Sequence, residues 1–440
     1  MKKLLLSISF LSLGFAANAQ SWTSQATGFN IASRGIEEIN IVDANTVWGL
    51  AYDGSGAGAT IQEFTLTTDG GATWTPGTIN VGDPALGINN ISPISATTAW
   101  VSAVNGTDGT GSVIFKTSDG GANWDQQNIG GFTNASSFVN YVHFFDANNG
   151  MAAGDPINGE FEIYTTNDGG DNWTLVPGAN IPNPLSGEYG YNGGNSAIGS
   201  TVWLVTNKGR ILKSSDMGLT WSVAQAPLTD FGGTAQSGRL IFSDLNNGAL
   251  LKIAGTTYTF YTTTNGGTTW SAGTPFTGTY RLLSYIPGTT TIVATGAGTT
   301  TGGTGSAYSS NNGTSWTSID SGAQRGVSAF FNGTTGWCAG FNTDPFTDGI
   351  FKLNGTLAND SFNATSFKVY PNPANNFVTI ATEGLDSYNL RVTDLSGKVM
   401  MAKELTGIEN TVDVSSYAAG VYFFEVNSGS KSETIKIIKN

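Results

Sequence analysis

A short motif that recurs six times limits the folds open to this chain more than any other feature. Its first copy, Thr-Thr-Asp-Gly-Gly-Ala-Thr-Trp, runs from Thr67 to Trp74, and the shared pattern is Ser/Thr-x-Asp/Asn-x-Gly-x-x-Trp. The Asp or Asn recurs every 46 to 50 residues, and such a period indicates a repeat architecture. The motif positions and their tryptophans are Asp69, Asp119, Asp168, Asp216, Asn265, Asn311, Trp74, Trp124, Trp173, Trp221, Trp270 and Trp316.

The residue types predict a tight turn at each copy. An Asp or Asn side chain accepts backbone N–H bonds across a turn, and Gly adopts the positive φ that such turns need. The Trp is large enough to lie over the hairpin and bury it, and apolar residues such as Leu66 and Ile114 precede the copies. Each copy is therefore predicted to be a β-hairpin turn. Asn265 and Asn311 suit this structural role and argue against a catalytic carboxylate.

A second repeated unit lies halfway between the motifs and consists of an apolar strand, a polar turn and another apolar strand. It occurs seven times, at residues 39–52, 91–104, 142–154, 197–206, 240–254, 283–295 and 327–341. Ser21-Trp22-Thr23 resembles Ser315-Trp316-Thr317 but has no strands before it. We therefore expect residues 21–26 to complete the seventh unit, since ring closure removes exposed strand edges. The predicted fold is all-β, a seven-bladed β-propeller over residues 20–354, with the last strand of each blade beginning at the motif Trp.

The six motifs resemble the Asp boxes of the BNR-repeat propellers. That group includes sialidases, some endoglucanases, sortilin-type receptors and photosystem assembly factors. The resemblance implies that the twelve motif residues are structural and lie away from the binding face. It implies a fold but not an activity.

A second domain is predicted after the repeats end. Residues 355–366 are small and polar, as in a linker, and residues 367–440 contain alternating strands enough for a small β-sandwich. The segments Tyr370–Pro373, Asp394–Lys398, Gly420–Tyr422 and Lys436–Lys439 resemble the type A C-terminal sorting domain of the Bacteroidota type IX secretion system. This resemblance implies that the type IX machinery is a partner, and that the domain is removed with release or surface attachment. The alternative is a carbohydrate-binding or spacer sandwich.

The N-terminus predicts secretion. Lys2 and Lys3 precede an apolar run, and Ala17-Asn18-Ala19 is a cleavage signal, so residues 1–19 are predicted to be a signal peptide. No later stretch is long and apolar enough for a transmembrane helix. We expect a protein that crosses the periplasm and is secreted or held at the outer-membrane surface.

Composition excludes several functions. Charged residues are 12% of the chain and the net charge is −13, which is unsuited to nucleic-acid binding. The single histidine, His143, rules out a His cluster or a Ser-His-Asp triad, and the single cysteine, Cys338, rules out an intramolecular disulfide. We expect no cofactor, no metal site and a monomer. A calcium ion at Asp168 and Asp171 is the one metal alternative, without EF-hand spacing to support it.

Candidate ligand-binding residues lie in loops opposite the Asp boxes. The longest such loop, residues 176–195, carries Glu188, Tyr189 and Tyr191, and the loop of the seventh blade carries Asp344 and Phe346. Exposed aromatics with acids suit a sugar- or peptide-binding surface on a rigid scaffold. The alternative is that these aromatics only anchor their loops.

Four arginines, Arg34, Arg239, Arg281 and Arg325, each stand just before an inner strand. They are candidates to converge on a carboxylate or sulfate through bidentate bonds. The alternative is that they bond loop carbonyls or acids such as Glu37 and Glu38.

A glycoside hydrolase needs two carboxyl groups facing each other, for which Glu188, Asp344 and Asp155 are candidates. The favoured prediction is a secreted or cell-surface propeller that binds an extracellular glycan, peptide or protein without catalysis. The alternative is a sialidase-like or endoglucanase-like hydrolase of extracellular carbohydrate. An acidic pair across the central channel would favour the hydrolase, whereas amides, glycines and lone aromatics there would favour binding.

Overall fold

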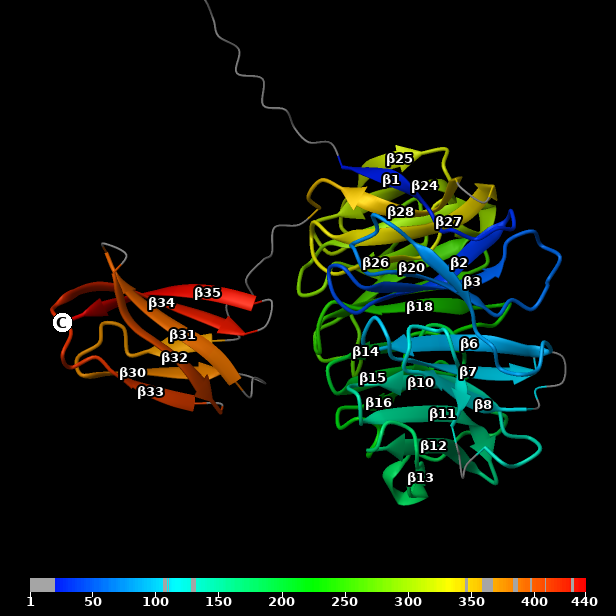
Figure 1. Ribbon diagram of the computed structural model, residues 1–440, viewed down its shortest axis with the longest axis horizontal. Helices are drawn as coiled ribbons and strands as arrows, with labels where there is room; N and C mark the ends of the chain where they lie inside the picture. Colours follow the sequence, from blue (N-terminus) through cyan, green and yellow to red (C-terminus); the bar gives the residue numbers. More distant parts are fainter. Residues whose placement is uncertain are drawn as a thin grey trace, which may run out of the picture. The chain divides into compact units, whose positions relative to one another are not determined.

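The computed structural model describes residues 20–105, 109, 111–127, 132–344, 347–357, 367–382, 387–395, 398–407, 409–428 and 431–440. The predicted signal peptide, Phe346 and most of the predicted linker lie outside these residues. The chain divides into two units, Met1–Asn359 and Asp360–Asn440, shown as ribbons in Figure 1. Almost all of the regular secondary structure in the described residues of each unit is β-strand.

The first unit is a seven-bladed β-propeller, as predicted, with four antiparallel strands in each blade. The sheets of blades 7 and 1 are joined through the single pair Gly35 and Phe341. Two short 3-10 helices, Gly178–Asn180 and Thr299–Thr301, lie in connections. Within a blade we call the strands A to D in chain order, with D of blade 7 supplied by β1.

The strands of blades 1 to 4 are, in order, β2 (Arg34–Ile41), β3 (Val47–Asp53), β4 (Glu63–Thr67), β5 (Thr75–Thr78), β6 (Leu86–Pro93), β7 (Ala99–Asn105), β8 (Val113–Thr117), β9 (Asp125–Gln126), β10 (Val139–Phe144), β11 (Gly150–Ile157), β12 (Glu160–Thr166), β13 (Thr174–Leu175), β14 (Ser196–Ile198), β15 (Thr201–Val205), β16 (Arg210–Ser214) and β17 (Ser222–Gln225). Those of blades 5 to 7 are β18 (Ser237–Phe242), β19 (Gly248–Ala254), β20 (Thr257–Thr263), β21 (Thr274–Pro275), β22 (Leu282–Tyr285), β23 (Ile292–Gly298), β24 (Gly303–Ser309), β25 (Thr317–Ser321), β26 (Ser328–Phe330), β27 (Gly336–Asp344), β28 (Thr347–Asn354) and β1 (Ser21–Ala26).

The ring is closed by the first strand of the chain. β1 pairs antiparallel with β28 over six residue pairs, from Ser21 with Asn354 to Ala26 with Gly349. Figure 1 shows the blue β1 beside the yellow β28. The Gln20 amide also donates to the Thr356 carbonyl at 2.9 Å. Strands from the two ends of the propeller therefore make one blade, which leaves no open edge at the seam.

The Asp boxes are hydrogen-bonded turns between strands C and D. In the first box the Asp69 carboxylate accepts bonds from the backbone N–H and the hydroxyl of Thr73, while the Thr67 hydroxyl donates to Asp69 and accepts from Gly71 N–H. Asp119, Asp168 and Asp216 repeat these bonds. Strand D begins after the motif Trp rather than at it, because the box turn includes that residue; β5 begins at Thr75.

The Asn boxes keep the same turn by reversing one bond. Asn265 Oδ1 accepts from Thr269 N–H, as an Asp oxygen does, while its Nδ2 donates to the Thr269 hydroxyl. Asn311 does the same with Ser315. A hydroxyl both donates and accepts, so it serves either side chain. The amide therefore replaces the carboxylate without loss of a hydrogen bond.

A Trp–Lys pair links some blades to the next. Trp100 Nε1 and Lys116 Nζ both donate to the Gly169 carbonyl in the box of blade 3, at 3.1 and 3.0 Å. Lys116 also lies 5.1 Å from the centre of the Trp100 ring. The other two pairs keep part of this arrangement. Trp203 Nε1 donates to the Gly266 carbonyl of blade 5, with Lys213 5.4 Å from the Trp203 ring. Lys352 Nζ donates to the Gly70 carbonyl of blade 1 and lies 5.7 Å from the Trp337 ring. These contacts join strands B and C of one blade to the turn of its neighbour.

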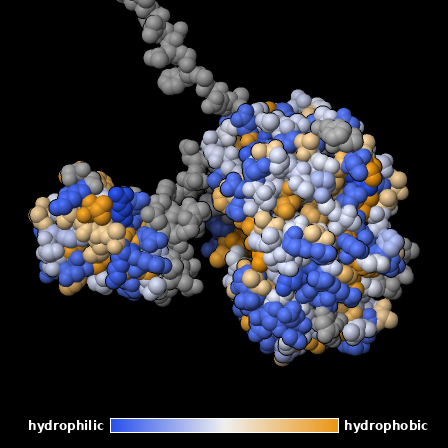
Figure 2. All heavy atoms as spheres, viewed as in Figure 1, coloured by the Kyte–Doolittle hydropathy of each residue, from blue (hydrophilic) through white to orange (hydrophobic). Residues whose placement is uncertain are grey.

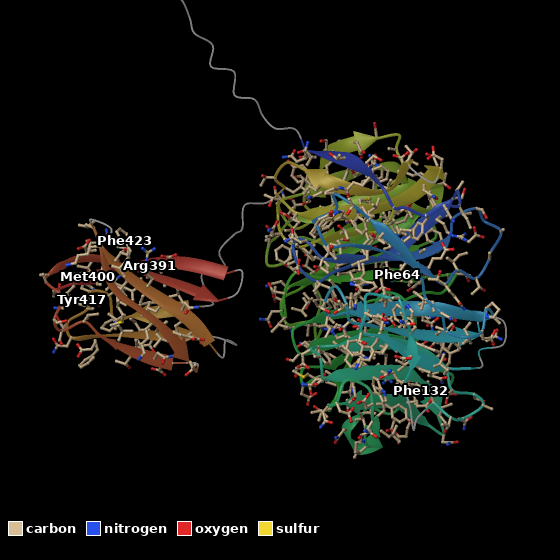
Figure 3. The ribbon with its side chains drawn as sticks, viewed as in Figure 1. Phe64, Phe132, Arg391, Met400, Tyr417 and Phe423 are labelled. Atoms are coloured by element: carbon tan, nitrogen blue, oxygen red, sulfur yellow. The ribbon has the colours of Figure 1, made fainter. Side chains whose placement is uncertain are left out.

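The propeller core lies between adjacent blades. Trp48 and Phe64 of blade 1 pack with Ile91 and Trp124 of blade 2 in one buried cluster. Phe64, labelled in Figure 3, lies 4.9 Å from Trp48 and 6.2 Å from Trp124 between ring centres. Because each blade face is covered by the next blade, these apolar residues are buried between blades.

The second unit is a small β-sandwich, as predicted. One sheet contains β29 (Phe367–Tyr370), β30 (Phe377–Thr382) and β33 (Glu409–Asp413). The other contains β32 (Val399–Thr406), β31 (Ser387–Asp394), β34 (Gly420–Ser428) and β35 (Lys431–Lys439). Alternating residues such as Leu390, Val392, Phe424 and Val426 are buried between the sheets.

Candidate functional site

The antiparallel blades give the propeller two chemically different ends. The A–B turns and the C–D Asp boxes share one end, so the B–C and D–A loops share the other. Strands A surround the axis: β2 contacts β6 and β26, β6 contacts β10, and β18 contacts β14 and β22. Residues on strands A near the loop end are therefore the ones that a ligand at the axis would meet.

Strand pairing identifies equivalent residues on these inner strands. Each of five residues pairs with the fourth residue of its blade's strand B; they are Glu38, Asn90, Tyr141, Arg239 and Leu282. We call these five residues the inner layer. At one structural position the blades thus carry an acid, an amide, a phenol, a guanidinium and an alkyl group.

A bulge precedes the inner layer in three consecutive blades. The register shifts by one residue at Glu37 in β2, at Asn89 in β6 and at Asn140 in β10. A bulge turns one side chain out of the regular alternation, and bulges are common beside functional sites. Glu37 is exposed although it lies on an innermost strand. Solvent therefore reaches the axis at this level.

The long loop of residues 176–195 is pinned by a buried ion pair. Arg210 Nη2 lies 2.6 Å from Glu188 Oε2, and the Glu188 side chain is fully buried. Glu188 also accepts bonds from Leu185 N–H and the Thr206 hydroxyl. Burial alone would raise the pKa of Glu188, but these bonds and the Arg210 charge outweigh it and lower the pKa. Glu188 is thus an ionised anchor of the loop.

The same loop reaches from blade 4 to blade 2. Asn192 Nδ2 donates to Asn89 Oδ1 at 2.9 Å, and Gly190 N–H donates to Asp155 at 3.0 Å, which also accepts from Asn140. Burial raises the pKa of Asp155 despite these bonds. The loop end of the propeller is therefore lined by amides beside blades 2 to 4.

Tyr189 is the exposed aromatic of this loop. It is 44% exposed, and its ring meets that of Tyr191 edge to face at 5.6 Å. Tyr191 is half-buried and donates its hydroxyl to Asp230 at 2.7 Å. Tyr191 therefore holds the loop, while Tyr189 presents a ring to solvent.

The acids of blade 1 have raised pKa values. Glu37 reaches solvent, yet the protein that surrounds it, followed by repulsion from Glu38, raises its pKa to about 7. Burial also raises the pKa of Glu38 to about 7, although bonds from Asn40 and Ile91 oppose it. Both carboxyls are therefore near half ionisation at neutral pH.

Aromatic rings continue this surface along β10. Burial and the charge of Glu38 raise the pKa of Tyr141, and burial lowers the pKa of His143 to about 4. The two rings are parallel, 6.1 Å apart, and Phe145 meets His143 edge to face at 4.8 Å. At neutral pH this wall is uncharged.

The four arginines do not converge. Arg34 pairs with Glu63 at 2.8 Å and Arg325 pairs with Asp320 at 2.7 Å. Arg281 donates to two carbonyls, of Thr299 and Thr300, and stacks 3.9 Å above the Tyr258 ring. These three arginines are therefore paired locally, which was the alternative prediction. The acidic partners are Glu63 and Asp320 rather than Glu37 and Glu38.

Arg239 differs from the other three. It is exposed, and no hydrogen bond, ion pair or ring contact joins its side chain to another described residue. The surrounding protein lowers its pKa, while its side chain stays open to the solvent at the axis. Arg239 is thus a charged group of the inner layer without a partner among these residues.

The remaining acid candidate lies apart from the inner layer. Asp344 is exposed on β27 and accepts the Thr347 hydroxyl at 2.6 Å. Among the residues that the structure describes, no three His, Cys, Asp or Glu side chains gather as a metal site. Asp168 is occupied by its Asp-box bonds to Asn172.

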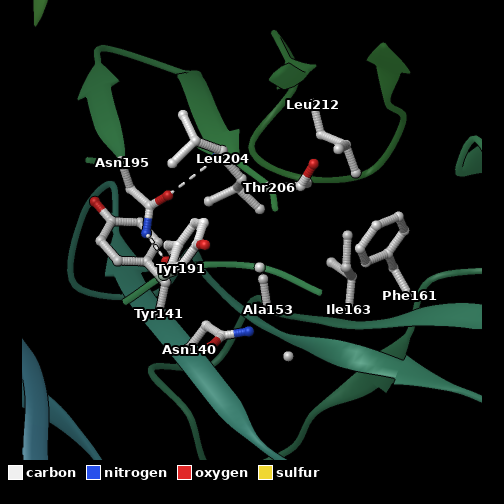
Figure 4. A pocket seen from close by; sticks show the side chains of 13 residues that line it. Asn140, Tyr141, Ala153, Phe161, Ile163, Tyr191, Asn195, Leu204, Thr206 and Leu212 are labelled. Carbon is white, nitrogen blue, oxygen red and sulfur yellow. Dashed lines mark hydrogen bonds between the residues drawn. The ribbon is translucent and has the colours of Figure 1, made fainter. Parts of the chain in front are cut away.

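A small cavity between blades 3 and 4 is shown in Figure 4. Its free volume is about 20 Å³, and Phe161, Ile163, Leu204 and Leu212 are among the residues that line it. Asn195 closes one side through its bond to the Tyr191 carbonyl. Such a volume holds about one water molecule, so this is a packing gap rather than a ligand pocket.

Comparison with known proteins identifies both units. Residues 368–440 match the secretion system C-terminal sorting domain, and residues 105–282 match the photosynthesis system II assembly factor YCF48. The chain is a BNR-repeat propeller with a sorting domain of the type IX system. No curated protein sequence matches it.

Solved structures share the propeller fold. YCF48 bound to D1 peptide is 16% identical with a TM-score of 0.51, covering 77% of this chain and 97% of that chain. YCF48 from Cyanidioschyzon merolae is 18% identical with a TM-score of 0.52, covering 76% and 99%. PorZ of Porphyromonas gingivalis, a surface component of the type-IX secretion system, is 15% identical with a TM-score of 0.44, covering 92% and 59%. At these identities the likeness to the two YCF48 structures establishes the fold alone.

The sorting domain indicates export of the BNR propeller by the type IX system to the cell surface or the medium. No helix among the described residues has the length and hydropathy to span a bilayer. On the face seen in Figure 2, hydrophobic residues of the propeller are scattered among hydrophilic ones.

Sequence reasoning missed the bulges of the propeller. The doublets Glu37-Glu38, Asn89-Asn90 and Asn140-Tyr141 recur about 51 residues apart. Two adjacent polar residues inside an otherwise alternating strand A would have been the signal for a bulge. The inner layer could then have been aligned between blades.

Proposed function

We propose that this protein is an extracellular binding propeller. Residues 1–19 direct it to the periplasm, residues 367–440 pass it to the type IX machinery, and residues 20–354 bind a glycan, peptide or protein through the B–C and D–A loop end. The observation that carries the proposal is the state of the predicted catalytic acids. Glu188 is buried in an ion pair, and Asp155 and Asp344 accept local hydrogen bonds.

The loop end supplies what a binding surface needs. Residues 176–195 have little regular structure, yet Glu188, Tyr191 and Asn192 each hold the loop to a different element. A long loop held rigidly is typical of binding sites. Such a loop presents Tyr189 at low entropic cost, because the backbone is ordered before the ligand arrives.

A glycoside hydrolase is the second candidate, and one observation favours it. Glu37 and Glu38 have pKa values of about 7, which suits a general acid. Both lie on β2, however, and hydrolysis needs a second carboxyl about 5–10 Å away across the substrate. Arg239, rather than an acid, occupies the inner layer of blade 5.

The test uses the mature chain from residue 20 on glycan and peptide arrays, with a parallel assay for new reducing ends. We expect binding without turnover, and binding weakened by Tyr189→Ala. Tyr370→Ala is the matched control, because Tyr370 is a similarly exposed tyrosine (46%) in the sorting domain. Reducing ends that disappear in Glu38→Gln would replace the binding proposal with the hydrolase.

A further inference from the structure

Arg239 is the exception among the six arginines of the chain. Arg34, Arg210, Arg325 and Arg391 each have a carboxylate partner, and Arg281 has two carbonyls and a tyrosine ring. Arg239 alone has none of these among the described residues, although it stands on an inner strand. An unpaired guanidinium can form bidentate bonds with the carboxylate of a ligand.

Glu37 and Glu38 present the opposite charge in the same region of the ring. No Lys, Arg or His among the described residues forms an ion pair with either of them. Among the described residues of the neighbouring blade 2, the Ile91 N–H donates to the Glu38 carboxylate at 3.2 Å. Burial raises the pKa of both carboxyls to about 7, and no adjacent positive charge among the described residues offsets this effect.

The two charges stand on inner strands of blades that lie on opposite sides of the ring. Glu38 and Arg239 occupy the same inner-layer position but belong to blades 1 and 5 of seven. Tyr141 of blade 3 lies between them along one side of the ring, and Leu282 of blade 6 lies along the other. The layer therefore has an acidic pole, an aromatic and neutral wall, and a basic pole.

We propose that the inner layer binds a dipolar ligand of the peptide class. An ammonium group would pair with Glu37 and Glu38, and a carboxylate would pair with Arg239. A short peptide with free termini carries both groups. The flat face made by Tyr141 and His143 would pack against the chain between them. This inference rests on the proposed binding function and names the ligand of its loop end.

The probes are alanine peptides of two to five residues, used with both termini free, with the N-terminus acetylated, or with the C-terminus amidated. Isothermal titration with the full mature chain should show one best length among the free peptides. Each blocked terminus should weaken binding at least about tenfold, because it removes one charge-assisted contact. Galacturonate and glucosamine are the carboxylate-only and amine-only probes, and should bind more weakly than the best peptide.

Variants assign each pole. Arg239→Gln should lose sensitivity to amidation but keep sensitivity to acetylation, and the double variant Glu37→Gln/Glu38→Gln should show the reverse. Arg391→Gln is the control, because Arg391 is exposed in the sorting domain and its ion pair is long, at 3.6 Å. Thermal unfolding of each variant establishes that the propeller remains folded.

Several outcomes would overturn the inference while leaving the proposed function standing. One is glycan binding on the array with no affinity for any free peptide. Another is galacturonate binding that depends on Arg239 but not on Glu37 and Glu38. A third is peptide binding that is unaffected by blocking either terminus. Loss of array binding altogether would instead contradict the proposed function.

Discussion

The two ends of the propeller use their repeats in opposite ways. At the Asp-box end, six turns form the same bonds, and even the change from Asp to Asn preserves them. At the loop end, equivalent inner-layer positions carry Glu, Asn, Tyr, Arg and Leu. Structural residues must satisfy the same geometry in every blade, whereas a ligand touches each blade differently. Divergence at equivalent positions is therefore the better indicator of function in this fold.

The largest effect is expected at the box end, where blade 7 meets blade 1. Trp337 is fully buried, contacts Trp74 edge to face, and lies below Lys352. Trp337→Ala should lower the free energy of unfolding by about 3–5 kcal/mol, because it leaves a cavity at the seam of the ring. Urea unfolding followed by tryptophan fluorescence measures this change.

Trp270→Ala is the control for that experiment, since Trp270 is a half-buried box tryptophan. It should cost less than Trp337→Ala. Equal losses would mean that burial at the seam between blades is not what stabilises the ring.

The next largest effect is a change in the free energy of unfolding with pH, which comes from an acid of the inner layer. The pKa of Glu38 is about 7 in the folded chain, above the value of 4.5 for a free side chain. The unfolded chain gives up this proton more readily, so the free energy of unfolding falls as pH rises from about 4.5 to about 7 and stays lower above that range. Glu38→Gln should thus stabilise the protein at pH 8 by roughly 1–3 kcal/mol and change little at pH 4.

The structure offers a precedent for this variant. Asn90, the inner-layer residue of blade 2, donates to the Val142 carbonyl at 2.8 Å and accepts from its N–H at 3.0 Å. An amide at position 38 should form similar bonds to blade 2. Chemical denaturation at pH 4, 6 and 8 tests this prediction. Because Glu37 also has a raised pKa, the free energy of unfolding of the variant should still fall somewhat as pH rises. Destabilisation at pH 8 would show that the Glu38 charge is compensated in solution.

The Trp337 and Glu38 variants probe two kinds of feature, one that the sequence predicts and one that it does not. The blades follow from Asp-Gly turns and paired apolar strands, which are local and repeat visibly. The partner of Arg34 depends on how two loops fold, and Glu63 lies 29 residues away without a periodic signal. The Glu188–Arg210 pair was missed for the same reason. Glu37 and Glu38 are visible in the sequence, but their raised pKa values could not be predicted from it, because those values depend on burial by the folded chain.

A smaller effect is expected within one Asp box. The Thr67 hydroxyl is buried, donates to Asp69 and accepts from Gly71 N–H. Thr67→Val should cost about 1–2 kcal/mol, because it leaves the buried Gly71 N–H without a partner. Asp69→Asn should be close to neutral, since Asn265 and Asn311 already hold the same turn. A large loss in Asp69→Asn would show that the boxes are not interchangeable.

The smallest effect on stability should come from the loop end. Tyr189 is exposed, and the loop is held by Glu188, Tyr191 and Asn192 instead. Tyr189→Ala should change the free energy of unfolding by no more than about 0.5 kcal/mol, yet reduce ligand affinity. Tyr191→Phe, which removes only the bond to Asp230, should instead loosen the loop, as hydrogen exchange of residues 176–195 would report. If Tyr189→Ala instead unfolds the loop and leaves binding intact, the exposed ring is an anchor, and the contrast between the two ends rests on the inner layer alone.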